Sequence, residues 1–219
     1  MTHYNVVVLG AGAAGMMAAI EAGKRGRTVL VVDHAEQAGE KIRISGGGRC
    51  NFTNTNATTE KGRDRFLSQN PRFALSALSR YTPEMFIALV KQYGIAFHEK
   101  TLGQLFCDGP ATQINAMLLS EMRKAGVALS LRTQIDRLER VDEGFALALS
   151  SGPVLADSVV VATGGKSIPK MGASGLGYQL AGQFGLRLID TRPALVPLTF
   201  EVGALEKLKE LSGIAVDAV

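Results

Sequence analysis

The first pattern that could do chemistry is a run of glycine and alanine, Gly10-Ala11-Gly12-Ala13-Ala14-Gly15. It follows a Val-rich segment, residues 5–9, and precedes an apolar segment with helical periodicity, residues 13–25. Glycines at this spacing permit a tight turn, a close approach of the backbone to a pyrophosphate and close packing of helix on strand. The free N–H groups at the helix N-terminus attract anions. We therefore expect Gly10, Gly12, Ala13, Ala14 and Gly15 to hold a diphosphate.

An acidic residue follows the glycine run at the spacing where a dinucleotide site needs a contact to ribose. Asp33 ends a β-branched run, residues 28–32, and lies 18 residues after Gly15. A carboxylate there accepts hydrogen bonds from ribose hydroxyls and disfavours a 2′-phosphate. The spacing favours a dinucleotide site over the alternative, a tight turn with no ligand, but does not distinguish NAD from FAD.

A second glycine run, Ser45-Gly46-Gly47-Gly48-Arg49-Cys50-Asn51, combines exposed N–H groups with one guanidinium and one thiol. Its glycines permit positive φ, and Arg49 offers a planar fork for a phosphate or carboxylate. The surrounding residues 40–56 lack periodicity and are expected to form a polar loop. Such a loop either wraps a phosphate or flavin, or is simply flexible.

Four segments together resemble one family: Gly10 to Gly15, then 39–54, Ala162-Thr163-Gly164-Gly165, and 192–198. The string Ser-Gly-Gly-Gly-Arg-Cys-Asn-x-Thr-Asn is similar to that of the BaiN-like FAD-dependent oxidoreductases, also called the aminoacetone oxidase family. The resemblance covers the N-terminal half of such a protein. It implies an FAD-dependent oxidoreductase of a small organic substrate, with NAD(P)H or oxygen as electron partner.

The resemblance also implies roles for individual residues. The first glycine run would hold the FAD pyrophosphate, and Asp33 the adenosine ribose. Ile135 would place its backbone beside the adenine. The remaining cofactor contacts would lie along the pyrophosphate and isoalloxazine or close over them: Lys41, Ser45, Gly46, Gly47, Gly48, Arg49, Cys50, Asn51, Ala162, Thr163, Gly164 and Gly165.

The catalytic residues stay open at this point. Arg49 and Lys41 are candidates for stabilising reduced flavin, or are only phosphate or solvent contacts. Cys50 is a weak candidate as a redox thiol, because the other cysteine, Cys107, lies 57 positions away. A packing or flavin-adjacent role is the alternative for Cys50. The sequence suggests no metal site.

The element pattern predicts an α/β, Rossmann-like FAD/NAD(P)-binding domain over residues 1–193, with a central parallel sheet. A β-meander is expected between residues 134 and 155, a small helical insertion over 57–110, and a short strand over 186–189. Residues 194–219 would begin an inserted β-rich domain that is truncated, so the C-terminal part of the FAD-binding domain would be missing. This piece alone is expected to bind FAD weakly and to be inactive.

Composition limits the other classes of protein. The chain of 219 residues is 46% apolar, carries a net charge of +4 and contains no Trp and four Tyr. The lack of aromatics argues against nucleic acid as a partner, and no apolar run is long enough for a membrane span. Two cysteines far apart suggest a reducing, cytoplasmic setting. The alternatives are an NAD-dependent dehydrogenase and a non-catalytic flavin-binding fragment; the sequence does not indicate the oligomeric state.

Overall fold

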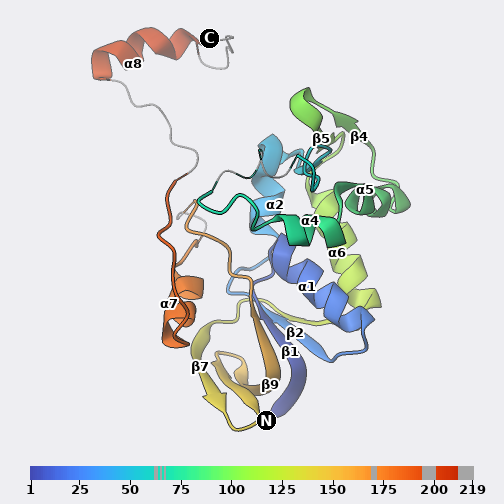
Figure 1. Cartoon of the computed structure of the whole chain (residues 1–219), viewed down its shortest axis with the longest axis vertical. Helices are drawn as coiled ribbons and strands as arrows, with labels where there is room; N and C mark the ends of the chain where they lie inside the picture. The colour runs from blue at the N-terminus through green and yellow to red at the C-terminus, as the bar shows by residue number, and fades with distance from the viewer. Residues whose placement is uncertain (62–63, 65, 67, 169–171, 194–200, 212–219) are drawn as a thin grey trace.

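The structure is a computed structural model that describes residues 1–61, 64, 66, 68–168, 172–193 and 201–211. Its centre is a six-stranded mixed sheet with the strand order β6-β2-β1-β9-β8-β7 (Figure 1). The strands are β1 (Thr2–Leu9), β2 (Val29–Val32), β6 (Ala128–Ser130), β7 (Ile135–Val141), β8 (Gly144–Leu149) and β9 (Gly152–Val161). β6, β2, β1 and β9 run parallel, whereas β7 and β8 join the edge beside β9 as antiparallel strands. The predicted Rossmann-like fold and β-meander are confirmed.

β9 is longer than the sequence suggested. The sequence predicts a meander that ends at residue 155, but in the structure the last meander strand continues without a break to Val161. Its first half pairs with β8, and its residues 154–161 pair with β1 in parallel, with Val7 opposite Val159. The meander is therefore a direct extension of the nucleotide-binding sheet.

The two faces of β1 belong to two apolar clusters, as the alternation of side chains in a strand requires. Val8 packs with Met16 and Ile20 of α1 (Ala13–Lys24) and with residues of α6 (Thr112–Lys124). Val7 packs on the opposite face with Leu147 of the meander and Leu180 of α7 (Leu176–Gln183). Burial on both faces explains the continuous Val-rich run.

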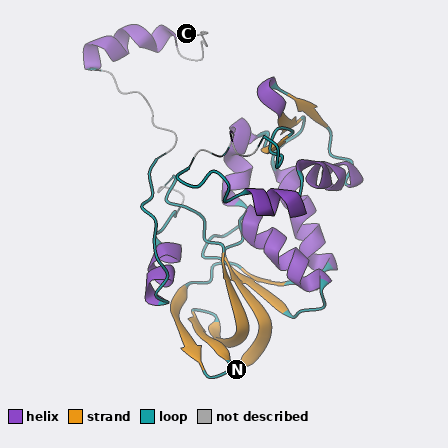
Figure 2. Ribbon diagram, in the orientation of Figure 1, coloured by secondary structure: helices purple, strands orange, loops and turns teal. Residues whose placement is uncertain are grey.

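Residues 51–61 and 68–107 form a second region, which lies farther from the six-stranded sheet than α1 and α6 do (Figure 2). It contains α4 (Leu75–Arg80) and α5 (Pro83–Gln92), where Thr82 Oγ1 accepts a hydrogen bond from the Met85 N–H at the start of α5. It also contains a three-stranded antiparallel sheet of β3 (Asn51–Asn54), β5 (Gln104–Cys107) and β4 (Phe97–Glu99), with a 3-10 turn, η2 (Thr101–Gly103). The predicted helical insertion over 57–110 thus holds β4 and β5 as well as helices. Within this predicted insertion, residues 62, 63, 65 and 67 lie outside the described part of the chain.

Two local predictions are wrong. Residues 40–56 are not a simple polar loop: they form α2 (Glu40–Ile44), a 3-10 turn η1 (Ser45–Gly48) and β3. Residues 186–189 are not a strand, and their large side chains are exposed, with Leu186 at 64%. Periodicity could not find α2, because five residues give little more than one turn.

The last described elements are α8 (Val202–Leu208) and η4 (Lys209–Leu211). The expected start of a β-rich domain over 194–219 falls partly on residues 194–200 and 212–219, which lie outside the described part of the chain. That boundary stays a prediction.

Candidate functional site

The three glycines of the β1–α1 turn have different roles. Gly10 has a φ of +110°, and a Cβ there would lie 2.5 Å from the carbonyl oxygen of Ala162 on the segment after β9. A Cβ at Gly15 would lie 1.8 Å from the carbonyl oxygen of Gly10. A Cβ at Gly12 would meet nothing within 4 Å. Gly10 and Gly15 therefore permit close packing, whereas Gly12 keeps the mouth of the turn open.

The N-terminus of α1 faces that opening. The first helical hydrogen bond runs from the Met16 N–H to the Gly12 carbonyl oxygen at 2.9 Å. The N–H groups of Ala13, Ala14 and Gly15 therefore have no partner within the helix. Ala13 and Ala14 are exposed and line the cavity above the turn. This donor set, with the positive end of a 12-residue helix, suits a diphosphate.

Asp33 is fixed at the same opening. Its Oδ2 accepts a hydrogen bond of 2.7 Å from the Ala11 N–H, and its Oδ1 accepts one of 2.9 Å from the Ala35 N–H. His34 Nδ1 lies 3.4 Å from Oδ1. A carboxylate has about four acceptor positions, so both oxygens keep capacity for ribose hydroxyls. The acid lies beside the turn, as its spacing predicted.

Two adjoining cavities meet at Asp33, His34 and Gly172. The first, of about 410 Å³, lies above the turn and extends to an apolar wall made by Met17, Phe52, Phe86, Ile114 and Leu118. The second, of about 440 Å³, lies beside β7 and is lined by Gly10, Thr133, Gln134, Ile135, Thr163 and Leu176 among others. Together they form an extended cavity with the β1–α1 turn at its middle, which is the shape an extended dinucleotide requires.

The predicted cofactor residues divide into two groups. Those that line the cavities are Gly10, Gly12, Ala13, Ala14, Asp33, Lys41, Ser45, Cys50, Asn51, Ile135, Ala162, Thr163 and Gly164. Gly15, Gly46, Gly47, Gly48, Arg49 and Gly165 are not among the lining residues. The apolar wall was missed from the sequence, because its residues come from α1, β3, α5 and α6 and share no local motif.

Glycines of the 45–51 loop set backbone shape. Gly46, Gly47 and Gly48 have φ values of +57°, +66° and +83°. The loop is anchored by hydrogen bonds from the Cys107 N–H to the Arg49 carbonyl oxygen, 2.9 Å, and from the Ala111 N–H to the Gly48 carbonyl oxygen, 2.7 Å. This left-handed turn brings Cys50 and Asn51 to the cavity while Gly46 and Gly47 remain exposed.

The Arg49 side chain contacts Asp108 and does not line the cavity. Its Nη1 donates a hydrogen bond to the carbonyl oxygen of Asp108, and the side chain is exposed. The described geometry therefore gives Arg49 a role in anchoring the loop and does not bring its guanidinium to the cavity. Lys41 differs: its Nζ lies 3.3 Å from both the Gly165 carbonyl oxygen and Ser167 Oγ, so it bridges α2 to the segment after β9.

The two cysteines lie near each other despite their separation in the sequence. Asn51 pairs with Phe106 in the β3–β5 ladder, so Cys50 and Cys107 are on neighbouring chain positions across it. Both are buried free thiols. Burial raises the pKa of Cys50, an effect partly offset by a hydrogen bond with Ser45. Burial, followed by the nearby Cys50 and Asp108, raises the pKa of Cys107 to about 11. Both thiols are therefore protonated at neutral pH.

The comparison with known families decides the relationship. The family description "HI0933-like protein Rossmann domain" matches residues 4–219. The chain belongs to this family. HI0933-like proteins are FAD oxidoreductases with a Rossmann domain, so the family resemblance found in the motifs is confirmed.

Three curated relatives extend this result. The HI0933-like chain is 48% identical over 219 residues to an Escherichia coli (strain K12) protein named ribosomal RNA dihydrouridine synthase, covering 100% of this chain and 54% of the relative. A Haemophilus influenzae protein of the same name is 45% identical, covering 98% and 54%. A Clostridium scindens 3-dehydro-bile acid delta(4,6)-reductase is 30% identical, covering 96% and 50%. The chain spans about half the length of the curated relatives it matches.

Solved structures confirm the fold of the HI0933-like chain. Glycine oxidase from Geobacillus kaustophilus matches with a TM-score of 0.57 at 16% identity, covering 86% of this chain and 60% of that one. A 3-ketosteroid-delta4-(5alpha)-dehydrogenase from Rhodococcus jostii RHA1 matches with a TM-score of 0.56 at 19% identity, covering 75% and 46%. Within the described residues, no helix has the length and apolar character of a membrane span, and no cluster of metal-ligating side chains is found.

Proposed function

We propose that this chain is the FAD-binding part of a reductase that converts uridine in ribosomal RNA to dihydrouridine. The assignment of FAD as the cofactor rests on the open space above Gly12. There the free N–H groups of α1 and the carboxylate of Asp33 line one extended cavity. The substrate class comes from two relatives of 48% and 45% identity that bear this name. Bound FAD would supply the two-electron chemistry.

The cofactor-holding roles follow from the lining residues. The N–H groups of Ala13 and Ala14 would bind the pyrophosphate, and Asp33 the adenosine ribose. The cavity beside Ile135 would take the adenosine end, and the cavity with the apolar wall would take the isoalloxazine end. Lys41 would lie at the isoalloxazine end, because it lines the cavity that has the apolar wall.

Reduction of the uridine C5–C6 double bond adds one hydride equivalent to one carbon and one proton to its neighbour. The proton needs a donor within the site, and Cys50 is a cavity-lining thiol that is protonated at neutral pH. We assign Cys50 as the candidate proton donor. Its low exposure of 4% keeps competing water away. NAD(P)H is the proposed source of the electrons that restore reduced flavin.

This proposal departs from two expectations, one implied by the family resemblance and one drawn from composition. A small organic substrate and the exclusion of nucleic acid are not carried forward, because the two relatives at 45% identity or more are named for ribosomal RNA. The proposed type of reaction is still an oxidoreduction. All three relatives have names that indicate reduction of a carbon–carbon double bond.

The direct test uses the full-length protein and ribosomal RNA that lacks the modification. We expect a yellow protein whose flavin absorbance is bleached by NAD(P)H, and dihydrouridine in the digested RNA by mass spectrometry. A protein that cannot be reconstituted with FAD, or that binds NADH tightly without a flavin, would support an NAD-dependent dehydrogenase instead.

A second candidate is reduction of a conjugated double bond in a 3-oxo steroid acid. The relative at 30% identity and the apolar wall of the cavity favour it. Oxidation of NAD(P)H that depends on such a steroid, with no dihydrouridine formed in RNA, would select this reaction.

A further inference from the structure

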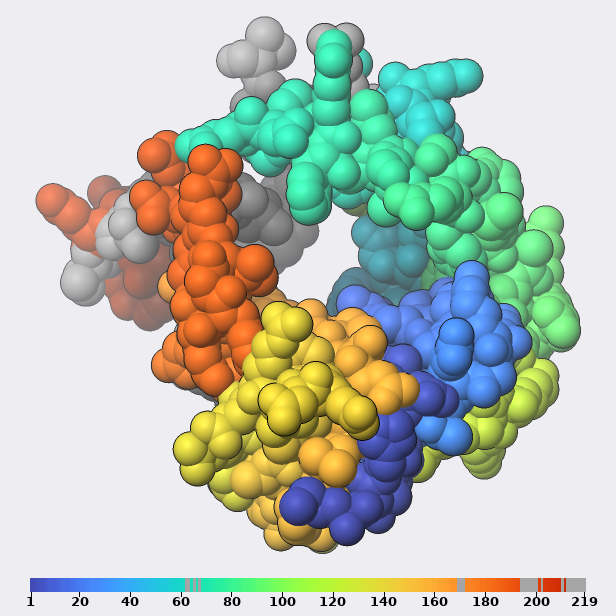
Figure 3. Space-filling model, turned by 60° about the horizontal axis from the view of Figure 1, so that its bottom comes forward, coloured from blue at the N-terminus to red at the C-terminus, as the bar shows by residue number. Residues whose placement is uncertain are grey.

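A short segment, residues 68–82, carries cationic and aromatic side chains near α1, where Tyr81 and Met17 line one small pocket. It contains Arg72, Phe73, Arg80 and Tyr81 and no Asp or Glu. Figure 3 shows the chain around this segment closing one side of an opening, with α1 and the sheet opposite. A count of aromatic residues over the whole sequence cannot detect such a local combination.

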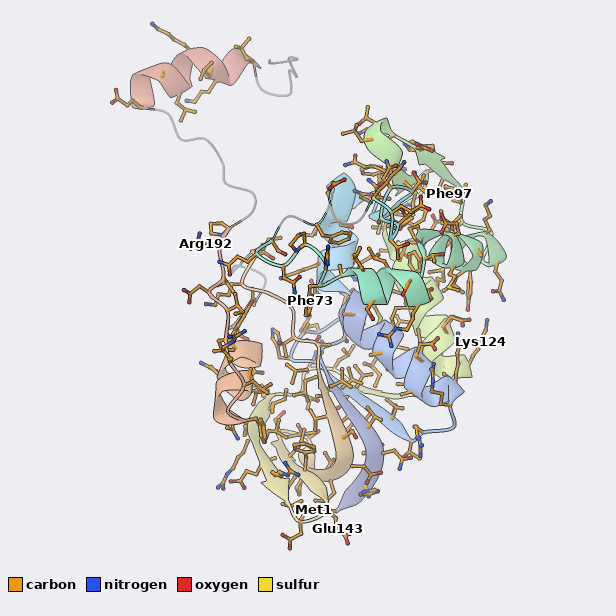
Figure 4. The ribbon with its side chains drawn as sticks, viewed as in Figure 1. Met1, Phe73, Phe97, Lys124, Glu143 and Arg192 are labelled. Atoms are coloured by element: carbon orange, nitrogen blue, oxygen red, sulfur yellow. The ribbon has the colours of Figure 1, made fainter. Side chains whose placement is uncertain are left out.

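Phe73 is the most exposed large apolar side chain in the described part of the chain, at 83%. The turn that presents it is ordered by hydrogen bonds from the Phe73 N–H to the Asn70 carbonyl oxygen, 3.0 Å, and from the Leu75 N–H to the Arg72 carbonyl oxygen, 3.1 Å. Figure 4 places Phe73 ahead of α4, on the side of the chain that borders the opening. A ring held on a firm turn and left in solvent is a surface for stacking.

Cations flank this ring. Arg72 is exposed directly beside Phe73. Arg80, at the other end of α4, is held by hydrogen bonds from its Nε to the Ser76 carbonyl oxygen, 3.1 Å, and from its Nη2 to Ser76 Oγ, 2.6 Å. A guanidinium has five N–H donors, so Arg80 keeps donors for another ligand. An exposed aromatic ring, with one arginine before it and one after it in a segment that has no Asp or Glu, matches the bases and phosphates of a single nucleic-acid strand.

We propose that residues 68–82 bind single-stranded RNA beside the cavity, with Phe73 stacking on a base and with Arg72 and Arg80 contacting phosphates. This inference rests on the proposed function, which supplies RNA as the partner. It adds the surface that would hold the strand while one uridine enters the cavity.

The test is fluorescence anisotropy of full-length, flavin-loaded protein with a labelled, uridine-containing single-stranded RNA of about 12 nucleotides. Phe73→Ala should weaken RNA binding about tenfold or more. Phe73→Trp keeps an aromatic ring and should bind RNA as the wild type does. Arg72→Glu should weaken binding and lower the slope of log K against log salt by about 1. Leu186→Ala and Arg140→Glu are matched controls for an exposed apolar side chain and a surface cation, and should bind as the wild type does.

Two results would overturn the proposal. Binding within about twofold of wild type for both Phe73→Ala and Arg72→Glu would exclude this surface. A loss of flavin or a lower Tm in Phe73→Ala, with RNA affinity unchanged, would show that Phe73 is covered by another part of the polypeptide. If the variants weaken RNA binding while no dihydrouridine is formed by the wild type, the surface stands and the proposed reaction fails.

Discussion

The two glycine-rich segments of this chain look alike in the sequence but do different work. In residues 10–15, glycine lets β1, α1 and the end of β9 approach closely and leaves an open mouth at Gly12. In residues 45–51, glycine supplies left-handed backbone that folds the loop onto β5 and α6. The first segment lines the cavity, and we propose that it binds the cofactor, whereas the second is a support that brings Cys50 and Asn51 to the same cavity. Glycine density alone therefore does not mark contact with a cofactor.

The largest effect should come from Gly15→Ala. The new Cβ would lie 1.8 Å from a backbone carbonyl oxygen that cannot move without displacing β1. We expect a loss of about 3 kcal/mol in the free energy of unfolding, measured by chemical denaturation of the full-length protein. A change smaller than that of Gly12→Ala, which meets open space, would contradict the packing role.

Gly46→Ala should have the next largest effect. Its φ is +57°, and the Cβ would lie 2.7 Å from the Phe106 ring and 2.8 Å from the Asn51 N atom. We expect a loss of about 2 kcal/mol, from left-handed strain and crowding together. Gly47→Ala is the matched control, since it has a similar φ but an open neighbourhood, and should cost about 1 kcal/mol. Equal losses would show that crowding against Phe106 is unimportant.

Arg49→Ala should affect stability and leave the cofactor in place. Its guanidinium donates to the Asp108 carbonyl oxygen and does not line the cavity. Loss of this exposed hydrogen bond should lower the free energy of unfolding by about 1 kcal/mol, with FAD affinity unchanged. Lys41→Ala, at a residue that lines the cavity, is the comparison and should weaken FAD binding. If Arg49→Ala loses FAD while Lys41→Ala retains it, Arg49 contacts the cofactor.

The smallest effect concerns pH. Burial raises the pKa of Cys107 to about 11, above the value in an unfolded chain. The folded state then binds the proton more tightly, so stability is complete below the unfolded pKa of about 8.5 and falls as pH rises through the folded value. Cys107→Ala should flatten the stability profile above pH of about 8.5. If the stability of Cys107→Ala falls at alkaline pH as steeply as that of the wild type, other titratable groups cause the fall.

The features of this fold that depend on neighbouring residues are predictable from the sequence. The Val-rich strands, the helix after Gly12 and the acid at Asp33 follow from short-range periodicity and spacing, and the structure places them as expected. The apolar wall, the adjacency of Cys50 and Cys107 and the outward direction of Arg49 depend on pairing between distant segments. The strand expected at 186–189 shows the converse error, because an apolar run without a sheet partner does not become a strand.

The FAD content of purified full-length Gly12→Val protein tests directly whether the cofactor lies on the β1–α1 turn. Gly12 has extended backbone, with φ −79° and ψ −177°, that valine tolerates, and its side-chain direction is open, so the protein should fold. We expect a folded, colourless variant with FAD affinity reduced at least about tenfold, while Gly47→Ala stays yellow. A Gly12→Val protein that retains wild-type FAD affinity would show that the cofactor does not lie on the β1–α1 turn.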